Sequence, residues 1–228
     1  MKKIASLLLC AALSAGALGA DKDVEDLLAK MRKAYQETKT ASFELETTLL
    51  AVEGDVVIKM KGLFKSPNKL AVDIVMNIAS DERKINVISD GKQIYASATG
   101  VEEVGKTDFS IDRLNQALGA ANLEVLCFYD WKRQLSTDKG ANMHDSTLSI
   151  RKEKWKGKEW IVLEESAPRV DIYVEYFIDP KTHFIWKTIR MTLDKEFTNG
   201  EYVLTKLKTG LTISDKRFAP PIKTAPPA

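Results

Sequence analysis

Between residues 41 and 98, apolar side chains recur at every second position in runs that are separated by short polar turns. In the first run, for example, Phe43 and Leu45 flank Glu44. Successive side chains of a β-strand point to opposite faces, so this spacing predicts strands with one apolar and one polar face. Turn sequences such as Asp90-Gly91 favour hairpins between these strands. The segment is therefore predicted to form an antiparallel meander whose apolar face needs a cover.

Two stretches of the chain have helical spacing instead. Between residues 24 and 38 the apolar positions predict an amphipathic helix before the first strand. Between about 108 and 137, Ser110 is positioned to cap a short helix, and a second, more apolar helix is predicted after Gly119. Strands then resume, and they are predicted over residues 146–154, 159–165, 170–178, 183–193 and 201–209.

The number of strands limits how the apolar face can be covered. About ten strands spaced roughly 4.8 Å apart make a sheet about 48 Å wide, and two helices of about 10 Å diameter cover less than half of it. A twisted sheet of this width tends to curl, which brings its apolar side chains together. The predicted fold class is α+β and mainly β: a strongly curved antiparallel sheet of about ten to eleven strands, with helices covering the concave apolar face. That face encloses either a dry core or a cavity, and the periodicity alone favours neither.

The first 20 residues have the order of a cleavable signal peptide. Lys2 and Lys3 are followed by an apolar run that is too short to span a bilayer, and then by small residues. Residues 21–218 are predicted to form a single exported, soluble domain, and residues 219–228 an extended proline-rich tail. The chain has 34 basic and 32 acidic residues, and the leader holds two of the basic ones. The mature chain is thus nearly neutral, which gives no support for nucleic-acid binding.

The residue types that carry catalysis or metal binding are scarce. His144 and His183 are the only histidines and have no partner at ligand spacing, so no metal site is expected. The sequence has neither a glycine-rich phosphate loop nor a nucleophile elbow. The acidic pairs Glu102-Glu103 and Glu164-Glu165 are strand neighbours that face opposite ways, and their carboxylates are expected to be solvated. No catalytic residue, cofactor or metal is therefore predicted.

Several short phrases occur in an order that is typical of one known family. Residues 62–70 (GLFKSPNKL) resemble the second hairpin of the LolA/LolB-type lipoprotein carriers, and residues 89–95 (SDGKQIY) resemble a later hairpin of that family. The turn over residues 179–182 (DPKT) and the ending over residues 215–221 (DKRFAPP) are also similar to the family's. Each phrase is mostly turn chemistry, and it is their order across nearly the whole mature chain that carries the resemblance.

This resemblance implies a periplasmic protein with an incomplete β-barrel that is closed by helices over a hydrophobic cavity. Proteins of this family carry the acyl chains of lipoproteins between membranes without covalent chemistry. The expected partners are therefore lipid or lipoprotein acyl chains, together with inner- and outer-membrane transport proteins, and a monomer is expected. The alternative is a non-catalytic envelope sensor or protein-binding module that uses the same fold.

The implied cavity would be lined by the inward faces of the central strands and covered by the two helical segments. The predicted lining residues are Leu45, Leu49, Ile58, Met60, Val72, Ile74, Met76, Ile85 and Val87. The predicted lid residues are Leu28, Met31, Leu123, Leu126 and Trp131.

One position departs from the family pattern and concerns control of the lid. LolA carriers usually have an arginine immediately before the hairpin proline, which ties the lid to the barrel, and this chain has Ser66 there. Lys65 and Lys69 lie nearby but lack the planar fork with which arginine bonds several carbonyls at once. The resemblance therefore leaves the lid without an assigned latch.

Overall fold

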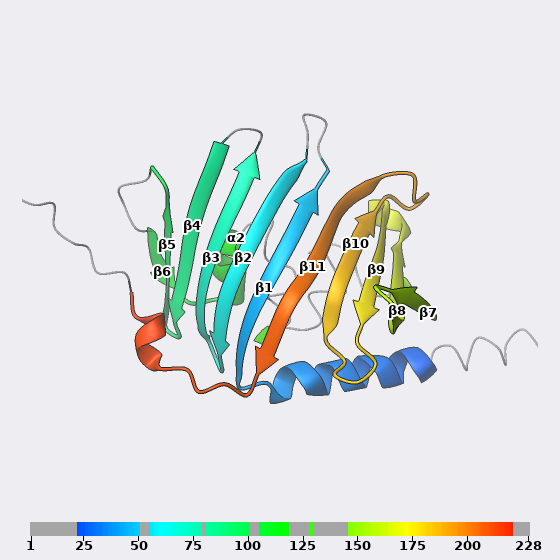
Figure 1. The fold of residues 1–228 in the computed structure, drawn as a ribbon, viewed down its shortest axis with the longest axis horizontal. Helices are drawn as coiled ribbons and strands as arrows, with labels where there is room; N and C mark the ends of the chain where they lie inside the picture. Colours follow the sequence, from blue (N-terminus) through cyan, green and yellow to red (C-terminus); the bar gives the residue numbers. More distant parts are fainter. Residues whose placement is uncertain are drawn as a thin grey trace, which may run out of the picture.

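The computed structural model describes residues 22–50, 55–78, 81–100, 105–118, 128–129 and 146–220, and within them eleven strands form one antiparallel sheet (Figure 1). The strands are β1 (Thr40–Leu49), β2 (Val56–Lys65), β3 (Lys69–Ile78), β4 (Asp81–Asp90), β5 (Gln93–Ala98), β6 (Gly105–Asp108), β7 (Thr147–Trp155), β8 (Lys158–Ala167), β9 (Ile172–Ile178), β10 (Ile185–Met191) and β11 (Thr198–Thr209). Their order in the sheet is β6-β5-β4-β3-β2-β1-β11-β10-β9-β8-β7. The edges are thus β6 and β7, and β1 lies at the centre.

Two meanders make up this sheet, one from β1 to β6 and one from β7 to β11. They are joined because the first strand pairs with the last, with Leu45 of β1 opposite Leu204 of β11. The meander predicted over residues 41–98 and the strands predicted after residue 146 are confirmed. The joint between β1 and β11 and the four-residue strand β6 were not predicted.

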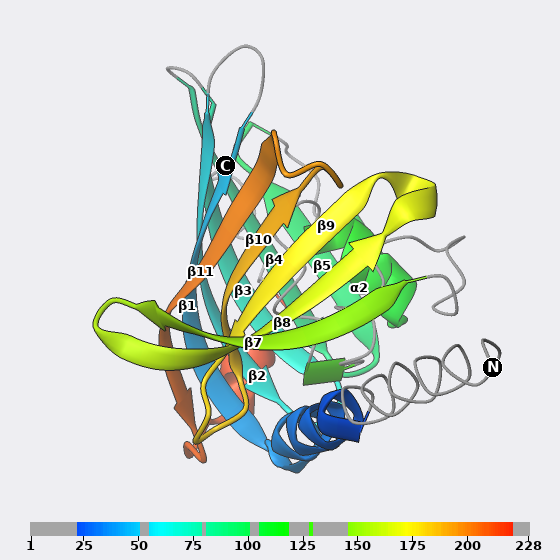
Figure 2. The same cartoon turned by 90° about the vertical axis from the view of Figure 1, so that its right-hand side faces the viewer.

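The sheet curves so that its two halves face one another across the concave side (Figure 2). A helix over residues 22–37, here the N-terminal helix, runs beneath the lower ends of β9, β10 and β11 (Figure 1). Its buried residues recur at helical spacing and are Val24, Leu27, Met31 and Tyr35. The short helix α2 (Ile111–Leu118) lies against β5, and the Ser110 hydroxyl accepts a hydrogen bond from the Arg113 N–H at 3.2 Å, as predicted for a cap. The predicted fold class is thereby confirmed.

Two separate apolar clusters fill the concave side. The first-half core comes from β1 to β5, α2 and Leu204 of β11, and its other large buried residues include Phe43, Leu45, Ile58, Met60, Phe64, Val72, Ile74 and Leu114. The second-half core comes from the N-terminal helix and from β8 to β10, and it includes Leu27, Met31, Tyr35, Leu163, Val174, Tyr176, Ile178 and Phe184. Inward and outward residues alternate along the strands as the period of two predicts.

Phe43 fits into the first-half core because its neighbour on β2 has no side chain. Gly62 lies directly opposite Phe43 in the β1–β2 pair. A Cβ atom at residue 62 would lie 2.0 Å from Cζ of the Phe43 ring, which is far too close for any contact. The ring therefore lies over the glycine backbone, in the way that aromatic residues cover glycines in other sheets.

After β11, the chain crosses the ends of the first strands and closes one end of the sheet (Figure 1). We call residues 210–220 the C-terminal strap. The Thr40 hydroxyl donates a hydrogen bond to the carbonyl of Leu211 at 2.8 Å. The strap then forms the 3₁₀ helix η5 (Asp215–Phe218), which contacts β3 and β4. The last residue of η5 is Phe218, whose side chain is 1% exposed and serves as the strap's apolar anchor.

Candidate functional site

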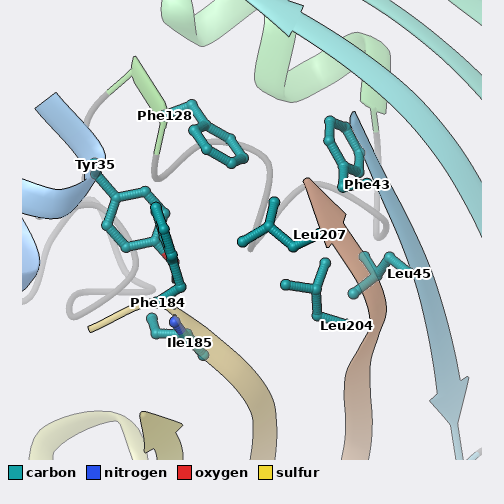
Figure 3. A pocket seen from close by; sticks show the side chains of 8 residues that line it. All are labelled: Tyr35, Phe43, Leu45, Phe128, Phe184, Ile185, Leu204 and Leu207. Carbon is teal, nitrogen blue, oxygen red and sulfur yellow. Dashed lines mark hydrogen bonds between the residues drawn. The ribbon is translucent and has the colours of Figure 1, made fainter. Parts of the chain in front are cut away.

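The two apolar cores meet at the joint between β1 and β11, where a small cavity lies (Figure 3). Its lining residues are Tyr35, Phe43, Leu45, Phe128, Phe184, Ile185, Leu204 and Leu207. Apart from the Tyr35 hydroxyl, these side chains consist of carbon. The cavity volume is about 10 Å³, comparable with the space that one water molecule needs. This cavity is therefore too small for an acyl chain, and a larger guest there requires movement of the N-terminal helix and Phe128, which we call the cavity cover.

Phe128 lies at the centre of the joint and packs against both apolar cores. Its ring centroid is 5.0 Å from that of Phe64 and 6.1 Å from that of Phe43, both in stacked geometry. On the other side, the Tyr35 ring meets it edge-on at 5.4 Å, and the Phe184 ring lies 6.5 Å away. Aromatic pairs at such separations contribute beyond the area that they bury. Phe128 thus connects the N-terminal helix with the first strands.

Tyr35 fixes the end of the N-terminal helix against β10. Its hydroxyl accepts a hydrogen bond from the Ile185 N–H at 3.1 Å. That N–H lies at an irregularity in the pairing of β10 with β9, between Ile185 and Lys187. The Tyr35 ring also meets the Phe184 ring edge-on at 5.0 Å. This side of the cavity cover is therefore attached by side-chain contacts and not by the hydrogen-bond ladder of the sheet.

The predicted lining residues lie together on the concave face, within or against the first-half core. Those that are buried are Leu45, Ile58, Met60, Val72, Ile74 and Val87, and those that are partly buried are Leu49, Met76 and Ile85. Register pairs such as Met60 with Ile74 place them on one face of the sheet. Leu45 also lines the cavity. Contact between these residues and a ligand stays a prediction.

The predicted lid residues fall partly within the described residues. Met31 is 1% exposed and belongs to the second-half core, and Leu28 is partly buried against the same core. Leu123, Leu126 and Trp131 lie outside the described residues. The N-terminal half of the predicted lid therefore packs on the concave side, next to the cavity.

Most of the cavity lining comes from residues that the sequence pattern did not single out. Leu204 and Leu207 come from β11, and Phe184 and Ile185 come from the start of β10 and the turn before it. Strand periodicity marks such residues as inward-facing, but it does not reveal that β11 pairs with β1. The cavity forms at that joint, so no local signal could have located it.

Glu165 is a buried carboxyl group on the concave face of β8, and the expectation that it is solvated is wrong. Its exposed fraction is 5%, because strand alternation turns it inward while Glu164 turns outward and binds Arg151 at 2.9 Å. The Tyr176 hydroxyl donates a hydrogen bond to Glu165 at 2.8 Å. Burial raises the pKa of Glu165 to about 7, although this hydrogen bond favours the ionised form.

The stability of the wild-type protein should therefore fall, relative to that of Glu165→Gln, as the pH rises from about 5 to about 8. The pKa of Glu165 is about 7 in the folded protein and 4.5 in a free glutamate, so the folded state holds the proton more tightly. This contribution is fully present below the lower pKa and is lost as the pH rises through the higher one. The difference should reach about 2–3 kcal/mol. Urea denaturation at both pH values measures it, and Glu164→Gln is the outward-facing control. Parallel pH curves for wild type and Glu165→Gln would mean that Glu165 is ionised when buried.

The two lysines beside the hairpin proline bind the C-terminal strap. Asp215 forms ion pairs with Lys65 at 2.6 Å and with Lys69 at 3.0 Å. These contacts hold the pKa of the Asp215 carboxyl below its usual value. The backbone N–H of Ser66 donates to the carbonyl of Lys39, just after the N-terminal helix. Ser66, which stands where LolA carriers usually have an arginine, thus lies close to the end of the N-terminal helix. The side chains of Lys65 and Lys69 instead bind the C-terminal strap.

In the described part of the chain, no group of three or more His, Cys, Asp or Glu side chains could hold a metal ion. None of its helices combines the length and the apolar character that a membrane crossing requires.

The comparisons with known proteins bear on the fold. The sequence matches no protein-family model and no curated protein. The structure is similar to that of MucB, with 13% identity over 87% of this chain and 62% of MucB and a TM-score of 0.51. It is also similar to an uncharacterized conserved protein from Thermus thermophilus, with 6% identity over 89% of this chain and 96% of that one and a TM-score of 0.55.

A LolA superfamily protein, NE2245 from Nitrosomonas europaea, is also among the similar structures. Its identity is 11% over 86% of this chain and 96% of that one, with a TM-score of 0.40. Identities this low show a likeness of fold and nothing finer. This chain spans about 62% of the length of MucB.

Proposed function

We propose that the protein is a periplasmic, non-catalytic carrier, which binds acyl chains of lipoproteins or other lipids and moves them towards the outer membrane. The observation that carries the proposal is the cavity at the β1–β11 joint, which is lined by carbon except for one hydroxyl. Apolar surface lies on both sides of it, in two cores that are separate clusters. An acyl chain that enters between the two cores replaces the apolar contacts between them with similar apolar contacts to itself.

The cover of the cavity is suited to such an exchange. The N-terminal helix and Phe128 are attached by side chains, whereas β1 and β11 are held by a backbone ladder whose register shifts once, between Glu44 and Leu45. Burying a CH₂ group contributes about 0.8 kcal/mol, so ten of them contribute about 8 kcal/mol, which offsets the loss of several contacts of the cover. In the open state, the predicted lining residues of the first-half core would form one wall of the binding site.

The location and the partners follow from the same proposal. The signal-like leader supports export, and the ordered motif phrases support a carrier of the LolA/LolB type. The chain would then act as a monomer that receives its cargo from an inner-membrane partner and delivers it to an outer-membrane one. A carrier needs reversible apolar binding and no reacting group.

A second candidate is an envelope sensor that binds another protein. The observation that favours it is the likeness to MucB, because one solved MucB structure is its complex with MucA from Pseudomonas aeruginosa. In this case the apolar cores would be a folding core, and the recognition surface would lie elsewhere. The two candidates differ in the molecule that should be bound to the purified protein, which is acyl lipid for a carrier and another protein for a sensor.

Mass spectrometry of an organic extract of the exported protein tests the proposal. The carrier should release acyl lipid, and the delipidated protein should bind 1-N-phenylnaphthylamine, which palmitate displaces. Leu204→Gln should lower this binding at least tenfold, because it places an amide in the cavity lining. Val203→Gln is the control, since Val203 precedes it on the opposite face of β11. A delipidated wild type that binds no palmitate, yet retains an envelope protein, would favour the sensor.

A further inference from the structure

A row of hydroxyl-bearing side chains crosses the concave face. It lies one inward-facing position along the strands from the cavity lining. The strand register places opposite one another Thr47 of β1, Tyr202 of β11, Thr188 of β10 and Tyr176 of β9. We call these four residues the hydroxyl row. Leu45 and Leu204, which line the cavity, are two positions along the same strands from Thr47 and Tyr202. The row therefore borders the cavity at the joint between the two halves of the sheet.

The two threonines of this row are fully buried, and the structure shows no partner for either side-chain hydroxyl among the described residues. Thr47 is 0% exposed and Thr188 is 1% exposed. Neither hydroxyl oxygen has a hydrogen-bond partner within the described residues. Both lie on the inward face, where neighbouring positions such as Ile58, opposite Thr47, are apolar. A buried hydroxyl normally finds a partner, so two unpaired ones beside a cavity need an explanation.

The Tyr202 ring does not separate the threonines from the cavity. A Cβ atom on Gly200 would lie 3.3 Å from Cε2 and 3.4 Å from the hydroxyl oxygen of Tyr202. The ring thus lies over Gly200, whereas Leu204 and the cavity lie on the other side of Tyr202 along β11. Thr47 is therefore the next inward-facing residue of β1 after Leu45 of the cavity lining, and Thr188 follows in the row beyond Tyr202.

We propose that Thr47 and Thr188 are a polar subsite that binds the carbonyl oxygen of an acyl ester or acyl amide, while the attached hydrocarbon occupies the adjacent cavity. This inference rests on the proposed acyl-binding function. A threonine hydroxyl is a donor, and a carbonyl oxygen is an acceptor without a hydrogen of its own. Two strand spacings separate the threonines by about 10 Å, so one carbonyl engages one of them and a diacyl ligand can engage both.

Three probes that differ at a single group test this subsite. They are 1-palmitoylglycerol, its ether analogue 1-O-hexadecylglycerol and its amide analogue N-(2,3-dihydroxypropyl)palmitamide, each used to displace 1-N-phenylnaphthylamine from the delipidated full chain. The wild type should bind the ester, the amide or both about three- to tenfold more tightly than the ether, as expected for one net hydrogen bond. Preference for the ester points to a glyceride lipid, and preference for the amide to an N-acylated protein.

The variants Thr47→Val and Thr188→Val, alone and combined, keep the branched shape and remove the donors. The double variant should bind the ether as the wild type does and lose its preference for the carbonyl. Its Tm should be unchanged or higher, because an unpaired buried hydroxyl has been removed. The single variants identify which threonine serves a ligand with one carbonyl.

Several results would overturn this inference. Equal binding of ester, amide and ether by the wild type would remove the subsite and leave the acyl-binding function intact. A double variant that keeps the carbonyl preference would place the donor elsewhere. A Tm lowered in both single variants would mean that the hydroxyls are bonded within the fold. If the wild type binds none of the three probes, the proposed function fails together with the subsite.

Discussion

Replacing Phe218 with alanine is expected to lower the free energy of unfolding by about 3–5 kcal/mol, which corresponds to a fall in Tm on the order of 10 °C. The Phe218 side chain is 1% exposed at the end of η5, so its removal leaves an apolar hole between the C-terminal strap and the sheet. The ion pairs of Asp215 with Lys65 and Lys69 cannot compensate for that loss, because Asp215 is largely exposed and exposed pairs are worth little.

Phe197 is the matched control for this variant. It lies between β10 and β11 and is 66% exposed, so Phe197→Ala should change the free energy of unfolding by no more than about 0.5 kcal/mol. Urea denaturation of both variants measures the contrast. Equal stabilities would mean that the strap is not anchored by Phe218. The family-like ending of the sequence would then have no structural role in this protein.

Strand periodicity predicted the fold because each half of the sheet is a local meander. The inward positions of β2 and β3, such as Ile58 and Ile74, follow directly from the period of two, and their burial confirms it. The Ser110 cap could be predicted for the same reason, since a helix start is a local signal. These features depend on neighbours in the sequence.

Features that depend on distant residues could not be predicted. The β1–β11 joint brings together residues more than 150 positions apart, and the cavity forms there. Glu165 was wrongly expected to be solvated because its sequence context shows its strand parity but not which side of β8 becomes the concave side. The contacts of Phe128 could not be predicted for the same reason, because Phe64 and Tyr35, whose rings lie against it, are distant from it in the sequence.

Replacing Phe128 with alanine should lower the stability and raise the affinity for apolar ligands. The ring is packed between both apolar cores, so its loss should cost about 2–4 kcal/mol, somewhat less than for a fully buried phenylalanine. The space that it leaves adjoins the existing cavity, whose volume is about 10 Å³. An engineered apolar cavity of roughly 150 Å³ in another protein stays dry and binds benzene, so the enlarged cavity should accept one ring of 1-N-phenylnaphthylamine and leave fewer side chains to be displaced by the rest of the probe.

Two measurements on Phe128→Ala show whether the Phe128 ring covers the cavity or forms part of the surface that contacts the acyl chain. If Phe128 is a cover that must move before an acyl chain enters, the variant should bind 1-N-phenylnaphthylamine more tightly than the wild type. Excess ligand should then restore part of the lost Tm, because binding to the folded state alone stabilises it. Phe128→Leu, which fills more of the space, should lie between the two proteins in both respects. Weaker binding by Phe128→Ala than by the wild type would instead make the ring part of the surface that the acyl chain contacts. The cover would then reside in the N-terminal helix, where Tyr35 attaches it to β10.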